Sequence, residues 1–277
     1  MKLSIITINY NNREGLLRTM ESVFGQTSDD FEYIVVDGDS TDGSKEIIAR
    51  YDSVSTHPFR WISEKDNGIY HAMNKGIQLA SGDFIQFLNS GDTIVNQDVT
   101  KIMLEVIPDN CNIFYGNMLK QLPKRIIRDK GFEGRVPTMM DFYTGTLNHS
   151  SAYIKRSLFE TYGLYDESLK IVSDWKWYLQ IIALNGVIPF YTDLDVTLFD
   201  MYGVSTLNLD LGKSERQQVL NEILHESVIS DYEKWAIPID QIKRINRYIL
   251  TKKGFLLIER VLFKWEKYKL RFIKNKK

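Results

Sequence analysis

The sequence predicts an α/β fold built on a doubly wound, mixed but mostly parallel sheet. Three observations support this prediction. Apolar runs alternate with amphipathic segments over residues 3–117, as in repeated strand and helix units. Several runs are continuous in Val, Ile and Phe, which is typical of strands buried on both faces. The runs end on Asn or Asp, at the sheet edge where ligands of such folds bind.

The first two strands are expected at residues 3–9 (LSIITIN) and 32–38 (EYIVVDG). Between them, Asn11 or Asn12 can cap a helix, because a side-chain amide oxygen accepts from the free N–H groups of a first helical turn. The second strand delivers Asp37 to the sheet edge. These elements therefore place polar side chains where two parallel strands end.

A strand, helix and strand over residues 60–92 form the centre of the prediction. The helix at 69–80 has apolar residues at the spacing of one face. Such a unit crosses over right-handed and puts both strand ends on one edge of a parallel sheet. Asp66 and Asp92 follow the two strands, so two carboxylates are expected to face one crevice.

Other elements follow from local periodicity and turn residues. Expected helices lie at 45–51, 98–107, 157–162, 173–184 with Ser173 as N-cap, and from Lys213 onward; expected strands lie at 112–117, 124–129, 146–155 (which carries His149), 187–191 and 196–201, with a loop at 130–138.

Composition and missing motifs exclude several classes of protein. With 43% hydrophobic and 26% charged residues, the chain is typical of soluble domains. Its one cysteine, Cys111, allows no intramolecular disulfide and favours a reducing compartment. No dinucleotide fingerprint, phosphate-binding P-loop or zinc motif is present. A bound phosphate would therefore need another device, such as a cation held by a carboxylate.

Charge is distributed unevenly along the chain. Residues 241–277 contain 13 Lys and Arg but only Glu259 and Glu266, although the whole chain has a net charge of −1. The segment 254–277 interleaves apolar and basic residues, which favours an amphipathic helix on an anionic membrane surface. A helix packed on the enzyme with a solvated basic face is the alternative. No nucleic-acid motif accompanies the patch, so nucleic acid is not an expected partner.

Five motifs occur in a fixed order: TINYN, YIVVDGDSTDGS, DNGIYHAMNKGI, GDFIQFLNSGD and SDWKWY. Together they resemble family-2 glycosyltransferases of the GT-A fold, over residues 1–205. The resemblance implies an inverting transfer of a sugar from a nucleoside diphosphate sugar to an acceptor hydroxyl, with Mg²⁺ or Mn²⁺ on the pyrophosphate. It also implies a division into a glycosyltransferase domain at 1–205 and a basic helical extension at 206–277.

The resemblance assigns five residues to the nucleotide. Tyr10 and Asp37 match residues that hold the base, usually uracil, and Asp66 matches an acid thought to contact the nucleoside. Asn74 and Lys75 follow in the next helix, where Lys75 can reach the pyrophosphate. Turn-forming or capping roles for Asp37 and a solvated helix face for Lys75 are the structural alternatives.

Two more residues of this region have no assigned part in nucleotide binding. Asp39 is expected to form a turn or cap a helix. His71 stands where relatives commonly carry Asp, so the resemblance assigns no role to it.

The resemblance also assigns the chemistry. Asp92 matches the last acid of the family's D-x-D element, here reduced to NSGD, and is expected to bind the metal. Asp174 matches the catalytic base, and the first turn of a helix favours its ionised form. His149 and Trp175 are candidates for contacts with the diphosphate or acceptor. A turn aspartate, a helix cap and a structural histidine are the alternatives for Asp92, Asp174 and His149.

The expected function is therefore transfer from a UDP-hexose or UDP-N-acetylhexosamine to a glycan, lipid-linked, in surface polysaccharide assembly. The expected location is the cytoplasm, with peripheral attachment to the inner membrane face left open. A catalytically silent nucleotide-sugar-binding module is the alternative, because NSGD offers one carboxylate. A nucleotidyltransferase is disfavoured, since TINYNNREG lacks a Gly-rich basic loop.

Overall fold

The structure is a computed structural model that describes residues 2–122, 124–201, 203 and 208–235. The chain divides into two compact units, Met1–Glu222 and Ile223–Lys277. The division expected between residues 205 and 206 stays a prediction, and the basic segment 254–277 lies outside the described residues.

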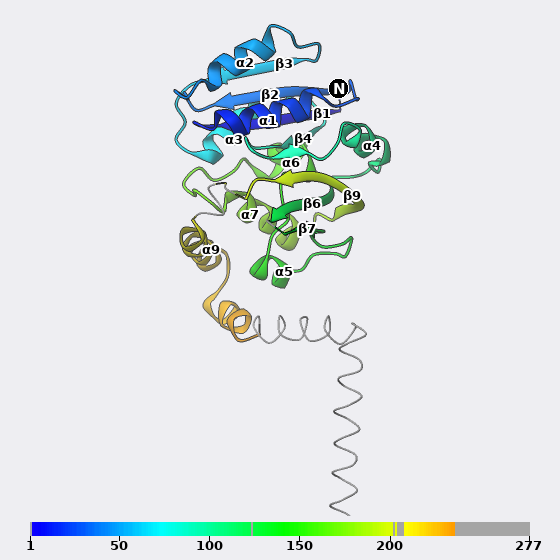
Figure 1. Ribbon diagram of the computed structural model, residues 1–277. Helices are drawn as coiled ribbons and strands as arrows, with labels where there is room; N and C mark the ends of the chain where they lie inside the picture. The colour runs from blue at the N-terminus through cyan, green and yellow to red at the C-terminus, as the bar shows by residue number, and fades with distance from the viewer. Residues whose placement is uncertain (1, 123, 202, 204–207, 236–277) are drawn as a thin grey trace, which may run out of the picture. The chain divides into compact units, whose positions relative to one another are not determined.

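The elements of the first unit are shown in Figure 1. The strands are β1 Leu3–Asn9, β2 Phe31–Asp37, β3 Phe59–Ser63, β4 Phe84–Phe87, β5 Thr93–Ile94, β6 Ile113–Leu122, β7 Arg125–Asp129, β8 Ala152–Lys155 and β9 Pro189–Phe199. The helices are α1 Arg13–Phe24, α2 Ser44–Asp52, α3 Ile69–Leu79, α4 Val99–Val106, α5 Met139–Thr144, α6 Ser157–Tyr162, α7 Ser173–Tyr178, the π-helical η1 Leu179–Leu184, and α9 Leu209–Ile223.

The strands form a mixed sheet in the order β3-β2-β1-β4-β8-β6-β9-β5, with β7 paired to β6. Strands β3, β2, β1 and β4 are parallel, whereas β8 runs antiparallel to both β4 and β6. The register aligns Asn9 with Asp37 and Asp37 with Ser63. Three strands therefore end side by side, as the sequence predicted, and their following loops share one edge.

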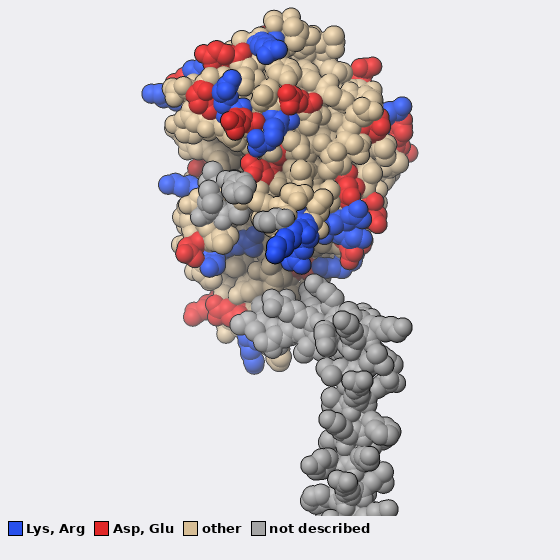
Figure 2. All heavy atoms as spheres, viewed as in Figure 1, with Lys and Arg blue, Asp and Glu red and all other residues tan. Residues whose placement is uncertain are grey.

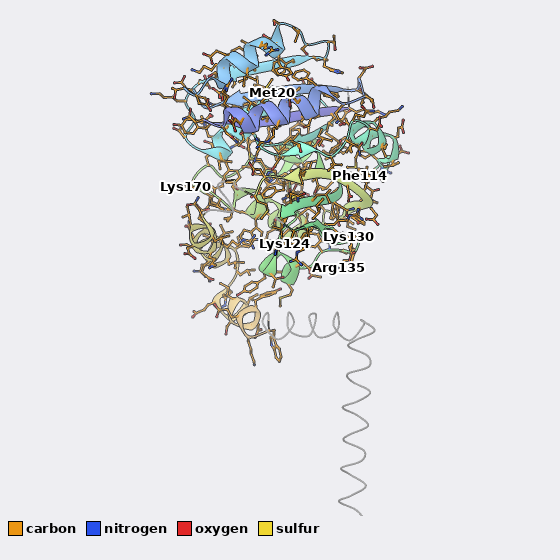
Figure 3. All side chains as sticks on the ribbon, in the orientation of Figure 1. Met20, Phe114, Lys124, Lys130, Arg135 and Lys170 are labelled. Carbon is orange, nitrogen blue, oxygen red and sulfur yellow. The ribbon has the colours of Figure 1, made fainter. Side chains whose placement is uncertain are left out.

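Helices cover both faces of the parallel strands. Leu3 and Ile5 of β1 pack with residues of α1, α2 and α4 on one face, in the core that contains Met20 and Phe114 (Figure 3). On the other face α3 lies so close to β1 that a Cβ atom at Gly76 would overlap the Ile6 side chain. This alternation along β1 is the period-two pattern of a strand, and it fixes α3 beside the end of the sheet.

The strand predicted at 146–155 is wrong in its first half. Only Ala152–Lys155 forms β8, and residues 146–151 form a turn in which the Asn148 side chain accepts from the N–H and hydroxyl of Ser150. An Asn side chain that bonds to the backbone two residues on favours a turn over a strand. His149 is therefore placed by a turn.

Three further boundaries differ from the prediction. Helix α7 begins at Ser173 itself, with Val172 as N-cap and no side-chain cap. The helix predicted through residue 184 becomes π-helical over η1. The two short strands predicted at 187–191 and 196–201 form one continuous strand, β9. The register between β9 and β6 shifts along this strand, which lets the pairing continue past the polar residues between the two predicted segments.

Within the described residues, no helix combines the length and apolar character needed to cross a membrane.

Gly76→Ala tests the close packing of α3 on β1. Alanine should gain up to about 1 kcal/mol of helix propensity but lose about 1–3 kcal/mol through overpacking against Ile6, so the protein should become less stable. Urea unfolding measures the change. Gln78→Ala, on the exposed side of α3, is the control and should be near neutral. A more stable Gly76→Ala variant would contradict this packing.

Candidate functional site

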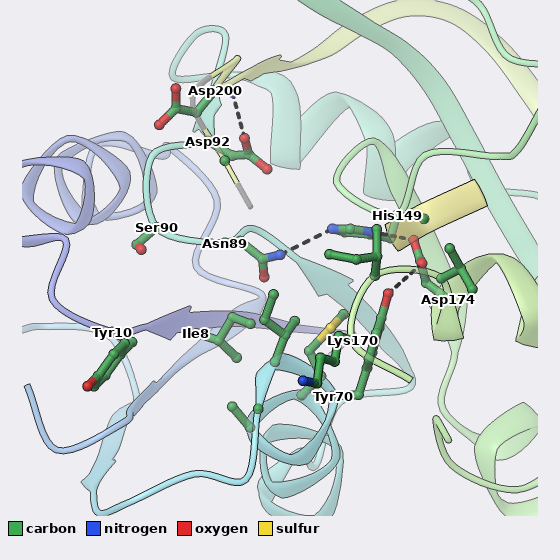
Figure 4. A pocket seen from close by; sticks show the side chains of 18 of the residues that line it. Ile8, Tyr10, Tyr70, Asn89, Ser90, Asp92, His149, Lys170, Asp174 and Asp200 are labelled. Carbon is green, nitrogen blue, oxygen red and sulfur yellow. Dashed lines mark hydrogen bonds and ion pairs between the residues drawn. The ribbon is translucent and has the colours of Figure 1, made fainter. Parts of the chain in front are cut away.

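A cavity of about 1120 Å³ opens at the carboxyl edge of the sheet. Its walls come from the loops that follow β1, β2, β3 and β4, from the start of α3, from the 146–149 turn, from residues 170–175, from the end of β9 and from α9. Segments far apart in the sequence thus meet in one pocket (Figure 4). This volume exceeds that of typical small-ligand pockets and can hold two substrates side by side.

Asp174, in the first turn of α7, lines the pocket. The Tyr70 hydroxyl donates to its Oδ1 (2.9 Å), and His149 Nδ1 lies 2.9 Å from its Oδ2 (Figure 4). Burial acts to raise the pKa of Asp174, but the hydrogen bond and charge of His149 and the Tyr70 hydroxyl outweigh it, so the pKa lies below its ordinary value. The carboxylate is therefore held ionised and in one orientation.

His149 connects Asp174 to the loop after β4. Its Nε2 lies 3.3 Å from the Asn89 side-chain nitrogen. Burial acts to lower the pKa of His149, but the hydrogen bond to Asp174 and the charges of Asp174 and Asp92 outweigh it and raise the pKa above its ordinary value. The sequence predicted His149 near the site, and the structure shows its partner to be Asp174.

Asp92 occupies the other side of the pocket, where it follows β4. It is only 4% exposed, and its Oδ1 accepts from the Asp200 backbone N–H (2.8 Å). Burial raises its pKa to about 7, and the nearby charge of Asp200 also raises it. An acidic group in this state gains from a bound cation, which offsets the cost of its negative charge.

Few of the described side chains near Asp92 are available to bind a divalent cation. Asp200, at the end of β9, lies beside it (Figure 4). Among the described residues, no group of three or more His, Cys, Asp or Glu is arranged to hold a metal. A Mg²⁺ or Mn²⁺ ion at Asp92 would therefore take most of its ligands from substrate phosphates and water, as is usual for such ions.

Three strand-end loops form the far end of the pocket. Tyr10 is 69% exposed there. Gly38 lies so close to the Tyr10 ring and the Asp66 carboxylate that a Cβ on it would sit 3.1 and 3.2 Å from them. Tyr10 and Asp66 therefore lie close together beside Gly38, and their contact with a nucleotide stays a prediction. Asp39, expected only as a turn or cap residue, has a positive φ of 64° and also lines the pocket.

Asp37 is at the predicted strand end, but its carboxylate points into the protein. It accepts from Asn9 Nδ2 (2.8 Å), from the Ser40 N–H and hydroxyl, and from the Ser63 hydroxyl (2.6 Å), and it does not line the pocket. These contacts fix the loop that carries Gly38 and Asp39. A direct contact between Asp37 and a base stays a prediction.

Three helix residues also lie outside the pocket lining. Asn74 is buried and bonds to the backbone N–H and carbonyl of Tyr165. Lys75 forms an ion pair with Asp66 (2.7 Å), and His71 Nδ1 lies 3.3 Å from the same carboxylate. The structure thus uses Lys75 to position Asp66, and a contact of Lys75 or Asn74 with the pyrophosphate stays a prediction.

The two tryptophans of SDWKWY face different environments. Trp175 lines the pocket, donates from Nε1 to the Phe142 carbonyl, and carries the Arg216 guanidinium over its ring at 4.8 Å. Trp177 packs in an aromatic cluster with Phe159 and Tyr165. Trp175 lines the pocket although it is only 1% exposed, and its contact with a substrate stays a prediction.

Several residues of the pocket were missed at the sequence level. Tyr70 and Asn89 lie inside two of the quoted motifs, but their partners are more than 50 positions away. Asp200 has a weak signal, since it follows the last strand. Arg216 has none, because only the packing of α9 brings it to Trp175.

Comparisons with known proteins identify the family. The family model described as "Glycosyl transferase family 2" matches residues 4–162. The chain is 31% identical over 184 residues to an uncharacterised glycosyltransferase of Mycobacterium tuberculosis, covering 64% of this chain and 68% of the relative.

Two solved structures are similar in fold. One is S. aureus TarS 1-349 in complex with UDP-GlcNAc, with a TM-score of 0.64 and 20% identity, covering 82% of this chain and 69% of TarS 1-349. The other is the mannosyltransferase PcManGT from Pyrobaculum calidifontis in complex with GDP-Man and Mn²⁺, with a TM-score of 0.61 and 16% identity. The match covers 97% of this chain and 82% of PcManGT. The GT-A fold predicted from the sequence is confirmed, and the chain belongs to glycosyl transferase family 2 and is a glycosyltransferase.

Proposed function

We propose that this glycosyltransferase is an inverting, metal-dependent enzyme that uses a UDP-sugar, a UDP-hexose or UDP-N-acetylhexosamine. One observation carries the proposal: Tyr70, Asp174, His149 and Asn89 form a continuous hydrogen-bonded chain across the pocket. The chain ends in the loop that carries Asp92. A base and a cation-binding carboxylate thus face one cavity, which a catalytically silent module would not need.

Asp174 takes the role of general base. Its carboxylate receives the proton of the acceptor hydroxyl while the hydroxyl oxygen bonds to the anomeric carbon and the bond to the diphosphate breaks. His149 and Tyr70 hold the carboxylate in place and stabilise its charge. Because one carboxylate suffices for a single displacement, the arrangement supports inversion.

Asp92, with Asp200 beside it, would hold the cation, which when bound neutralises charge on the departing diphosphate. Tyr10, Asp39 and Asp66 form the end of the pocket suited to the nucleoside. The TarS complex with UDP-GlcNAc and the PcManGT complex with Mn²⁺ support a UDP-sugar and a divalent cation here.

The acceptor in this proposal is a lipid-linked glycan of surface polysaccharide assembly, at the inner face of the cytoplasmic membrane. The basic, apolar composition of residues 254–277 supports membrane attachment.

Asp174→Asn should lower kcat by about 10²–10⁴, because the general base is lost, and leave UDP affinity unchanged. UDP release from UDP-glucose and UDP-N-acetylglucosamine, with octyl glycosides as acceptors, measures turnover. Glu105→Gln, exposed on α4, is the matched control. Undiminished turnover in Asp174→Asn would refute its role as base.

Tyr70→Phe should move the acidic limb of the pH profile of kcat/KM to higher pH. The Tyr70 hydroxyl helps to lower the pKa of Asp174, so its removal makes the base protonate at a higher pH. The profile of Tyr162→Phe, a change in a partly exposed tyrosine on α6, should match that of the unaltered protein. If the acidic limb did not move in Tyr70→Phe, the Tyr70 hydroxyl would have no effect on the pKa of the catalytic base.

Asp92→Asn should raise the thermal midpoint of the metal-free protein more at pH 8 than at pH 5. The pKa of Asp92 is raised from 3.8 to about 7, so the native state binds its proton more tightly than the unfolded chain, and stability falls as pH rises between these values. At about 1.4 kcal/mol per pKa unit, the effect amounts to a few kcal/mol.

Asparagine keeps an oxygen for the Asp200 N–H but carries no charge to desolvate. Calorimetry in EDTA at both pH values measures the change, and Asp83→Asn, with an exposed side chain, is the control. Equal shifts at pH 5 and pH 8 would contradict the buried, strained charge of Asp92.

A further inference from the structure

Three cationic side chains line one end of the pocket: Lys170, Lys213 and Arg216. Neither the motifs nor the proposed chemistry uses them. Lys213 and Arg216 lie three residues apart on α9, hence on one side of that helix. Lys170 precedes α7 in the chain and points toward the cavity near Tyr70 (Figure 4).

Arg216 is a partly buried cation for which the described residues show no ion pair within 4 Å, although the charge of Asp174 acts on it from farther away. Its guanidinium stacks over Trp175, and Nη1 makes one long hydrogen bond of 3.4 Å to the Gly145 carbonyl. Burial lowers the pKa of Arg216, but a guanidinium stays protonated in proteins. A charge placed in this way is costly unless an anion pairs with it.

Lys130 and Arg135 differ from Arg216 in this respect. Figure 2 shows Lys and Arg side chains among Asp and Glu on the face that includes β6 and β7. Lys130 and Arg135 lie there, on the opposite side of the fold from Lys170 in Figure 3. Lys130 pairs with Glu133 and Asp193, and Arg135 pairs with Asp141 at 2.6 Å. Arg216 differs from these two side chains because it is partly buried in the pocket and has no carboxylate in direct contact among the described residues.

The cationic end of the pocket is built rigidly. The buried Glu215 carboxylate accepts from the backbone N–H groups of Lys170 (2.7 Å) and Ile171 (2.9 Å). This pair of hydrogen bonds ties α9 to the segment that leads into α7. Lys170 and Arg216 are thereby held near each other, one on each side of the contact made by Glu215. Lys213 pairs with Asp210 at 3.0 Å.

The position relative to Asp174 indicates which substrate these cations meet. Trp175, under Arg216, directly follows Asp174, whereas His149 and Asn89 lead from Asp174 to the Asp92 side. In an inverting displacement the acceptor attacks opposite the leaving diphosphate. The diphosphate belongs beside Asp92, so the Arg216 side faces the acceptor.

We propose that Lys170, Lys213 and Arg216 bind an oxyanion, a phosphate or carboxylate group carried by the acceptor next to its reacting hydroxyl. The inference rests on the proposed function, which supplies the direction of attack. A guanidinium stacked on an aromatic ring presents its N–H groups in the plane that a phosphate or carboxylate requires. With a neutral acceptor, Arg216 would have no anion in direct contact and only the charge of Asp174 farther away.

The test uses the full chain saturated with UDP and Mn²⁺, so that the diphosphate site is filled. Calorimetric titration with α-D-glucose 1-phosphate, methyl α-D-glucuronide and methyl α-D-glucoside compares a phosphate, a carboxylate and a neutral sugar. At least one anionic sugar should bind tenfold or more tightly than the neutral one. The phosphate and carboxylate arms distinguish the two sources of the oxyanion.

Arg216→Gln and Lys170→Gln should each remove most of this preference and leave UDP affinity unchanged. Lys101→Gln, an exposed cation on α4 outside the pocket, should retain the preference. Lys170 is exposed, so Lys170→Gln tests the preference for anionic sugars even if Arg216→Gln perturbs folding. Equal affinity for anionic and neutral sugars, or a preference that survives both substitutions, would overturn the inference.

Two further results separate this inference from the proposed function. Displacement of UDP by glucose 1-phosphate would place the anion in the donor site and also overturn the inference. A failure of UDP to bind would count against the proposed function alone, because titration without UDP still reports whether Arg216 and Lys170 select an anionic sugar.

Discussion

The position of the Asp174 carboxylate between Tyr70 and His149 joins the separate parts of this fold into one site. Tyr70 comes from α3, which Gly76 lets pack closely on β1. His149 comes from the turn before β8, on the antiparallel side of the sheet, and it continues to Asn89 after β4. Each half of the sheet thus supplies one contact to the same carboxylate, so the position of the Asp174 carboxylate depends on how the two halves meet.

The pKa values of Asp174 and Asp92 are shifted in opposite directions. Asp174 is buried but surrounded by donors, and its pKa is lowered. Asp92 is buried with one backbone donor on its carboxylate, and its pKa rises to about 7. The first arrangement suits a group that works as an anion without further help. The second suits a group that completes its environment only with a cation and the phosphates of a substrate. The two environments therefore match the roles proposed for the two acids, base and metal ligand.

Local patterns predicted the N-terminal parallel strands, because each is a continuous apolar run between clear turn residues, and the five motifs placed Asp66, Asp92 and Asp174 at one pocket. The turn at His149 was not predicted, because residues 146–155 have the composition of a strand and the Asn148 side chain bonds to the backbone of Ser150 instead. The inward carboxylate of Asp37 depends on Ser40 and Ser63, and the place of Arg216 depends on Trp175 across the fold. Contacts between distant segments of this kind have no periodicity that a single sequence displays.

The central claim is that the cavity between Asp92 and Tyr10 binds UDP through a divalent cation. Isothermal titration of the full chain with UDP, first in EDTA and then in Mn²⁺, tests it most directly, with Asp92→Ala measured alongside. We expect strong binding in Mn²⁺, weak binding in EDTA, and loss of the metal-dependent part in Asp92→Ala. Absence of UDP binding under both conditions, or metal-dependent binding that persists without Asp92, would contradict it.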